Sequence, residues 1–227
     1  MSARSVRIHE LETEWLGRIA FERALAIQER RLAAIRDGSQ PEVVYFLEHE
    51  PVYTIGRTRD QSSLGQLPAL PHPLHRINRG GQATYHGPGQ LVGYPLLDLG
   101  RRVPDLHAYL RALEDWLIGL LAACGIEAAR RDSLTGVWVA GRKIASIGVG
   151  VRKWITMHGF ALNVGGALDG FAAITPCGIQ DVQMTSIERE SGRAASVRAV
   201  ARLAARRAPA LAAAVSPQPS TTTAASA

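Results

Sequence analysis

The sequence has little cysteine and no long apolar run, and each absence excludes a class of protein. Its two cysteines, Cys124 and Cys177, are not spaced as CxxC, so they indicate neither a disulfide framework nor a structural zinc site. No stretch approaches the ~20 apolar residues of a membrane-spanning helix. Residues 1–14 mix charges with isolated apolar side chains and lack the apolar centre of a secretory signal. We therefore expect a cytoplasmic protein that neither binds a metal nor enters a membrane.

The sequence also lacks a basic run, although its formal net charge is +6. Arginine supplies nearly all of the excess, and the pairs Arg130-Arg131 and Arg206-Arg207 are far apart in the chain. A scattered excess of this kind does not favour nucleic acid as the partner. It suits an acidic protein surface, which a positive protein encounters faster.

One large domain is the simplest interpretation of 227 residues. Hydrophobic residues make up 46% of the chain and charged residues 20%, the composition of an ordinary globular protein. Residues 208–227 are mostly Ala, Pro, Ser and Thr with hardly a charge, and such a segment has little apolar volume to bury. The sequence thus predicts a folded domain over residues 1–207 and a disordered tail over residues 208–227.

Three helices are predicted from apolar residues at steps of three and four. The first covers residues 14–36. The clearest covers residues 105–124, where Asp105 is suited to cap the start and Gly125 the end. Cys124 lies on the apolar face of that helix and is interpreted as a small core residue. A shorter helix rich in Ala and Arg covers residues 196–206.

Strand patterns lie between the helices, at residues 43–47, 52–55, 90–99, 136–150 and 155–164. Residues 136–150 form a predicted hairpin with its turn at Ala140-Gly141. Because helices do not regularly separate the strands, a doubly wound parallel sheet is disfavoured. The predicted fold class is α/β or α+β, with a mixed, largely antiparallel sheet flanked by helices.

A glycine-rich segment, RGGQATYHGPGQ at residues 79–90, is the most unusual part of the sequence. Glycine lets backbone N–H groups approach a ligand closely, and Arg, Gln, Thr, Tyr and His side chains surround it. The segment is no P-loop because it lacks the Gly-Lys-Ser/Thr ending. A tight turn with a solvated edge is the alternative, but such turns seldom combine Arg, Tyr and His so densely. A ligand-binding loop is therefore the favoured interpretation.

Three single residues have side chains suited to catalysis, and each could equally have a purely structural role. Cys177 lies in the loop TPCGI; as a thiolate beside a cation it would be a nucleophile, and otherwise a buried apolar side chain. Lys143 follows the hairpin turn, where a lysine is usually solvated. His158 stands between apolar residues, where a histidine is more often part of the core. Nothing in the spacing proves that these groups meet.

At this point the chain resembles a known family, the lipoyl(octanoyl) transferases of the biotin/lipoate ligase superfamily. Three segments carry the resemblance, and their order and spacing also agree: RGGQATYHGPGQLVGYPLLDL at residues 79–99, GVWVAGRKIASIGVGVRKWITMHGFALNV at residues 136–164, and TPCGI at residues 175–179. The resemblance spans residues 42–207. One departure is Ala83, where the family usually has a larger β-branched residue, so the shape of the acyl pocket is in doubt there.

The resemblance implies a single catalytic domain of the biotin/lipoate ligase type and assigns roles to particular residues. Cys177 would form an acyl-thioester intermediate and Lys143 would move the proton; His158 is left without a role. The implied substrate-binding residues are Arg79, Gly80, Gly81, Gln82, Ala83, Thr84, Tyr85, His86, Ser146, Ile147, Gly148, Gly159, Phe160 and Ala161.

The implied reaction moves octanoyl from octanoyl-acyl carrier protein to a lysine, the first step of endogenous lipoate synthesis. The implied acceptors are the lipoyl domains of 2-oxoacid dehydrogenase complexes and the glycine cleavage H protein. The resemblance implies no cofactor, neither ATP nor metal, and we expect a monomer. Exchange of one thioester for another is nearly isoenergetic, and transfer to an amine is downhill.

Two other functions compete with this interpretation. An ATP-dependent lipoate or biotin ligase has the same fold and uses a lysine at the position of Lys143 to hold an acyl-adenylate, but it needs no nucleophilic cysteine. A non-catalytic domain that binds a ligand or nucleic acid is the third candidate, although the chain has no N-terminal helix-turn-helix and no basic-aromatic surface pattern.

Overall fold

The computed structural model describes residues 11–64 and 70–216. Its centre is a seven-stranded sheet in the order β1-β2-β6-β10-β9-β8-β7. The first two strands pair in parallel, and every other neighbouring pair is antiparallel. The predicted mixed, largely antiparallel sheet is therefore confirmed. The strands are β1 (Glu12–Ile19), β2 (Val43–His49), β6 (Gln90–Leu96), β7 (Ala129–Arg131), β8 (Leu134–Val139), β9 (Arg142–Arg152) and β10 (Ile155–Asn163).

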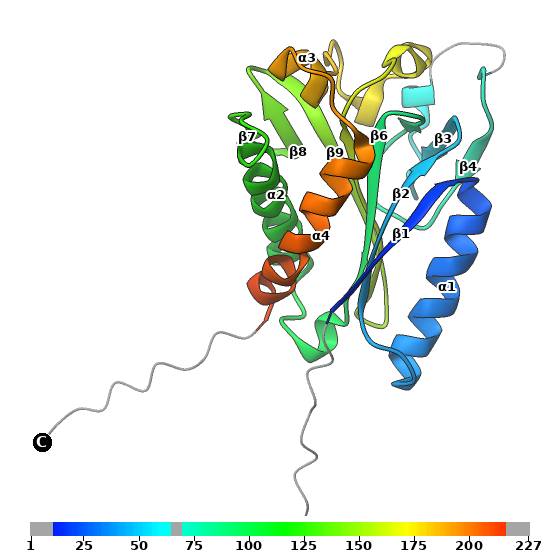
Figure 1. Cartoon of the computed structure of the whole chain (residues 1–227). Coiled ribbons are helices and arrows are strands. Elements are labelled where there is room, and N and C mark those ends of the chain that lie inside the picture. Colours follow the sequence, from blue (N-terminus) through cyan, green and yellow to red (C-terminus); the bar gives the residue numbers. More distant parts are fainter. Residues whose placement is uncertain (1–10, 65–69, 217–227) are drawn as a thin grey trace, which may run out of the picture.

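Helices cover both faces of this sheet (Figure 1). Helix α1 (Phe21–Asp37) packs on one face, and α2 (Leu106–Ala122) and α4 (Val197–Ala214) lie together on the other. The short helix α3 (Ile187–Ser191) precedes α4. Asp105 caps α2 as predicted, because its side chain accepts hydrogen bonds from the N–H groups of His107 and Ala108.

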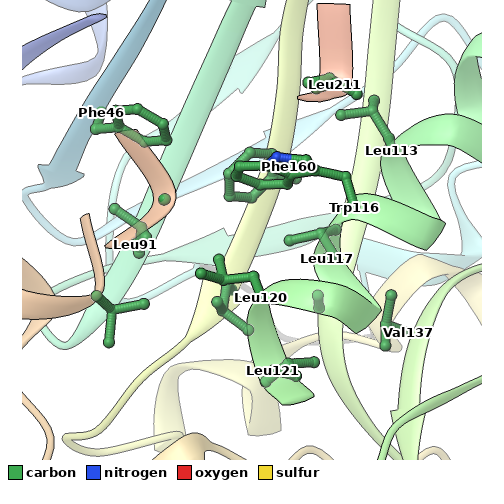
Figure 2. Packing of buried hydrophobic residues seen from close by; sticks show 14 of the residues in the cluster. Phe46, Leu91, Leu113, Trp116, Leu117, Leu120, Leu121, Val137, Phe160 and Leu211 are labelled. Carbon is green, nitrogen blue, oxygen red and sulfur yellow. The ribbon is translucent and has the colours of Figure 1, made fainter. Parts of the chain in front are cut away.

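The larger core fills the space between the sheet and the α2–α4 pair. Figure 2 shows Leu113, Leu117 and Leu120 of α2 packed towards the strands, with Phe160 beside Trp116 and Leu211 reaching in from α4. Burying a side chain of this size contributes about 1.5–3 kcal/mol, so the many buried side chains of this cluster contribute strongly to stability. Cys124 packs against the same cluster, in agreement with its interpretation as a core residue.

A second sheet of three strands lies beside the first, in the order β4-β3-β5. Its strands are β3 (Val52–Ile55), β4 (Leu74–Arg76) and β5 (Thr84–His86). The 3₁₀ turns of the chain are η1 (Ser62–Leu64), η2 (Leu99–Arg101), η3 (Asp169–Ala173) and η4 (Pro176–Gly178). Strand β5 and the turn η4 belong to the glycine-rich segment and the cysteine loop of the sequence, so this region carries two of the three motifs.

The helix predicted over residues 14–36 is wrong in its first third. Residues 12–19 form β1, which pairs with β2, and the helix starts at Phe21. Its apolar residues Trp15 and Ile19 fit a helical stripe, but backbone pairing along the sheet edge outweighs that local preference.

The disordered tail predicted from residue 208 is wrong over its first part. Helix α4 continues to Ala214, and Leu211 and Val215 are buried. Residues 217–227 lie outside the described ranges. Within residues 11–64 and 70–216, no helix is long and apolar enough to cross a membrane.

Candidate active site

Lys143 and Cys177 meet although they come from different parts of the chain. The Nζ of Lys143 lies 3.2 Å from the Sγ of Cys177, and the same Sγ lies 3.8 Å from the Oγ of Ser146. Lys143 is 1% exposed, so the local expectation of a solvated lysine does not hold. The geometry thus brings a basic side chain next to a thiol, the pairing that a cysteine nucleophile requires.

Backbone contacts fix Lys143 in this buried position. It is the second residue of β9, directly after the Ala140-Gly141 turn, whose two residues have φ of 45° and 81°. Its backbone N–H donates to Gln183 and its carbonyl accepts from Thr185, at 2.8 and 2.9 Å. Its Nζ also donates to the carbonyl of Thr135 at 3.3 Å. The amine is thus held between the hairpin and the strand-like segment at residues 183–185.

Cys177 is presented by a turn that glycine makes sterically feasible. The backbone of Cys177 is left-handed, with a φ of 57°, and its N–H donates to the carbonyl of Ala83 at 2.8 Å. The next residue, Gly178, also has a positive φ, and a Cβ there would lie 2.9 Å from the Cγ of Gln82. Glycine therefore lets the cysteine turn pack directly on the glycine-rich segment.

Arg79 places a second cation at the site. Its guanidinium donates to the carbonyls of Gly80, Gln82 and Thr54 and to the hydroxyl of Thr54, at 2.8–3.1 Å. The side chain is 6% exposed, and burial lowers the pKa of its guanidinium, which nevertheless stays charged as arginine does in proteins. Its four acceptors are all neutral oxygens, so the charge is held in place without a carboxylate.

A cavity of about 180 Å³ extends from the Lys143–Cys177 pair. Among its lining residues are both members of the pair and most of the predicted substrate-binding residues: Arg79, Gly81, Gln82, Thr84, His86, Ser146, Ile147, Gly148, Gly159, Phe160 and Ala161. Gly148 is needed there because a Cβ would lie 2.8 Å from the Cδ of Arg79. The structure thus brings the three sequence motifs to one cavity.

Three predicted substrate-binding residues do not line this cavity. Gly80 donates its N–H to Val149, Ala83 packs in the core of the small sheet, and Tyr85 packs against Phe171 in the same core. Alternation along β5 explains Tyr85, because Thr84 and His86 point to one side of the strand and Tyr85 to the other. Ala83 acts on the site through its carbonyl, which accepts the N–H of Cys177.

Several further residues line the cavity without having been predicted from the sequence: Phe21, Ile77, Tyr94, Ser133, Leu134, Thr135 and Ile179. Tyr94 and Ile179 stand inside the recognised motifs and could have been proposed from them. Phe21 is the first residue of α1, and the helix predicted over residues 14–36 placed it inside the helix instead of at its start. His158, which had no role, also lines the cavity.

Three buried histidines are neutral near pH 7; His86 and His158 line the cavity, and His49 lies behind Tyr94. His86 contacts Gln90 and Thr54, at 2.8 and 3.3 Å, and burial lowers its pKa to about 3. His49 contacts the hydroxyl of Tyr94 at 2.7 Å, and burial lowers its pKa to about 4. Burial likewise lowers the pKa of His158 to about 4. Neutral rings at this part of the wall suit an apolar group better than a charged one.

Known proteins with similar sequences belong to the same family that the three motifs indicate. The family described as the lipoyl protein ligase A/B catalytic domain matches residues 21–207. The octanoyltransferase of Geobacter metallireducens is 52% identical over 178 residues, which cover 78% of this chain and 82% of that protein. The octanoyltransferase of Syntrophotalea carbinolica is 48% identical over 189 residues, 82% of this chain and 87% of that protein.

Solved structures share the fold at much lower identity. Lipoate-protein ligase A bound with ATP has a TM-score of 0.71 at 18% identity, over 89% of this chain and 85% of that one. Biotin protein ligase from Aquifex aeolicus has a TM-score of 0.52 at 13% identity, over 90% and 69% of the two chains. The solved structures show the shared fold, and the two octanoyltransferases confirm the resemblance inferred from the three motifs. The chain belongs to the octanoyltransferases, acyltransferases within the lipoyl protein ligase A/B catalytic-domain family.

Proposed function

We propose that the chain transfers octanoyl from an acyl carrier protein to a lysine of a lipoyl domain, with Cys177 carrying the acyl group in between. The observation that supports this most is the 3.2 Å contact between Lys143 Nζ and Cys177 Sγ at the cavity. A fixed ammonium beside a thiol is the arrangement that activates a cysteine for attack on a thioester. The net charge of +6 suits an acidic carrier protein.

The first half of the reaction exchanges one thioester for another. The pair starts as the Cys177 thiolate beside the Lys143 ammonium, and the thiolate attacks the carbonyl carbon of the carrier's thioester. The new carbon–sulfur bond forms through a tetrahedral oxyanion, which the buried positive charge of Arg79 helps to stabilise. The carrier's sulfur then leaves and takes the proton from the Lys143 ammonium. Lys143 ends this half-reaction neutral, and Cys177 is acylated.

The second half uses the neutral lysine as a base. The amine of the acceptor lysine attacks the octanoyl carbonyl, and Lys143 removes the proton that the nitrogen must lose. Cys177 leaves as a thiolate beside the ammonium that has just formed, so the pair returns to its starting state. An amide is more stable than a thioester, and this difference drives the transfer without ATP.

Intact mass after mixing with octanoyl-acyl carrier protein, in the absence of ATP, tests the proposal. We expect a gain of one octanoyl group that hydroxylamine removes. Cys177→Ser is expected to abolish the adduct and Lys143→Ala to slow its formation by roughly 10²–10⁴-fold, the usual contribution of a proton-transfer residue. Cys124→Ser is the matched control, since it changes the other thiol and leaves the adduct in place.

The competing ATP-dependent ligase predicts a different result in the same assay. A ligase would leave Cys177 unmodified and would acylate a lipoyl domain from free octanoate or lipoate only when ATP is added. An unmodified protein that works in this way would contradict the proposed transfer. Cys177 would then be a loop residue with no catalytic role.

A further inference from the structure

His158 is a buried histidine in the cavity wall that the proposed reaction does not use. Its side chain is 3% exposed, and neither of its ring nitrogens has a hydrogen-bond partner within the described part of the chain. Buried polar atoms are ordinarily paired. A histidine left unpaired in the wall of a ligand cavity therefore calls for a role connected with the ligand.

The backbone at His158 turns its ring away from the direction that the strand would give it. His158 pairs with Val149 of β9, and Val149 belongs to the core beneath α2 and α4, so regular alternation would place the imidazole there. Instead the φ of His158 is 58°, and its ring lies 6.2 Å from that of Tyr94, which packs on the α1 side. The left-handed backbone thus directs the ring into the cavity.

A side chain of α1 holds this unfavourable backbone. Gln28 is fully buried, and its Oε1 accepts the N–H of His158 at 2.8 Å. Residues other than glycine adopt a left-handed backbone at an energetic cost, and they keep it where the surroundings impose it. The position of the ring is therefore a built feature of the cavity.

The register of the strands gives the distance from Cys177 to this ring. Cys177 lies against Ser146, and Ser146 pairs with Ala161 of β10. His158 is three residues from Ala161, about 10 Å along a strand that rises ~3.3 Å per residue. An extended octanoyl group, with carbon–carbon bonds of about 1.5 Å, measures roughly 9 Å from carbonyl carbon to methyl. A chain of this length attached to Cys177 and lying along β10 would end close to His158.

Resting on the proposed octanoyl transfer, we propose that His158 forms the end wall of the acyl cavity and sets the chain length that the site accepts. A longer chain meets the ring, and its extra methylenes would have to displace a side chain whose backbone is held by Gln28, which is unfavourable. Chain-length selectivity would then depend on one side chain, on its left-handed backbone and on Gln28.

The His158→Gly variant removes the end wall and suits the backbone, because glycine adopts a φ of this sign without strain. The measurement is the rate of thioester formation on Cys177 with octanoyl-, decanoyl- and dodecanoyl-acyl carrier protein. The dodecanoyl-to-octanoyl ratio of rate constants is expected to rise at least about tenfold. His158→Asn, which also tolerates the left-handed region, is expected to give a smaller rise.

Met157→Leu is the matched control, because Met157 is buried next to His158 in the sequence but belongs to the α1-side core and does not line the cavity. This variant is expected to keep the wild-type ratio. An unchanged ratio in both folded His158 variants would overturn the end-wall role, and melting temperatures establish which variants are folded.

A binding assay separates this proposal from the proposed function. The rise in melting temperature with octanoate, decanoate and dodecanoate reports occupancy of the cavity without acyl transfer. One outcome is that no thioester forms with any substrate, while His158→Gly makes the longer fatty acids raise the melting temperature most. The acyl-transfer proposal would then be wrong, and the end-wall role of His158 would be supported. If thioesters form but His158→Gly has the same chain-length preference as the wild type, only the end-wall role of His158 is wrong.

Discussion

Lys143 and Cys177 stand 3.2 Å apart across 34 residues of sequence because each is held by its own backbone. Lys143 is tied to residues 183 and 185, and Cys177 to the carbonyl of Ala83. A lysine side chain is flexible when solvated, but here the amine also contacts Thr135 and is buried. The pair is therefore positioned before any substrate arrives, which is how an enclosed site accelerates a reaction.

The buried histidines predict how stability depends on pH. Burial lowers the pKa of His49 and His158 to about 4 and that of His86 to about 3, below the ~6.5 of an unfolded histidine. The unfolded chain therefore binds more protons in acid, so this stability is complete above about pH 6.5 and is lost as the pH falls towards 4. With three such groups, the free energy of unfolding is expected to fall by up to about 4 kcal/mol per pH unit near pH 5.

Urea unfolding at pH 7, 6 and 5 measures this slope. His86→Gln removes one of the three groups and keeps a polar side chain beside Gln90, so its slope is expected to be smaller by about 1.4 kcal/mol per unit. A free energy of unfolding that stays constant between pH 7 and pH 5 would contradict the neutral, buried state of these rings.

At the scale of elements, α4 shows where a composition rule gives the wrong boundary. Residues 208–214 are rich in Ala, which is the best helix former, and Pro209 lies inside the helix. Leu211 nevertheless packs into the larger core (Figure 2), and the carbonyl of Ala212 accepts from Arg102 at 2.8 Å. Packing of a few apolar side chains keeps this segment folded.

Truncation tests this boundary. Deleting residues 208–227 removes the buried end of α4, whereas deleting residues 217–227 removes none of these contacts. Leu211→Ala alone is expected to cost about 3 kcal/mol, a fall in melting temperature of roughly 6–12 °C for a domain of this size. Equal melting temperatures for the full chain and the longer truncation would contradict the packed role of residues 208–215.

Sequence patterns predicted the elements whose local signal and tertiary environment agree. The hairpin formed by β8 and β9, the strand β3 and the helix α2 with its Asp105 cap appear within a few residues of the prediction. The prediction for the first helix was wrong because residues 12–19 form a strand by pairing with β2. Pairing with a distant segment is not visible in the local pattern of residues. The three-residue strands β4, β5 and β7 are too short for a periodic signal.

In the site too, residues within sequence motifs were predicted, and features set by contacts between distant segments were not. The motifs identified Cys177, Lys143 and the glycine-rich loop, and alternation along β5 would have separated Tyr85 from its two neighbours. The direction of the His158 ring depends on a left-handed backbone and on Gln28, 130 residues away in the chain. No pattern of residue types reports a contact of that kind.

At the scale of the whole molecule, the active site exists because two sheets lie side by side. Strands β9 and β10 of the larger sheet carry Lys143, Ser146 and His158, while the segment that includes β5 carries Arg79. The turn η4 brings Cys177 against both. Helix α1 adds Phe21 and positions His158, so every layer on that side of the larger sheet contributes to one cavity.

Kinetic competence of the acylated enzyme tests the central claim, that Cys177 is the carrier of the transferred group, most directly. The octanoyl form is isolated free of carrier protein and mixed with a lipoyl domain in the absence of ATP, and formation of the acylated lysine is followed by mass. The account predicts transfer at least as fast as steady-state turnover with octanoyl-acyl carrier protein. An octanoyl enzyme that keeps or hydrolyses its acyl group, while the lipoyl domain is acylated only when carrier thioester or ATP is added, would contradict it.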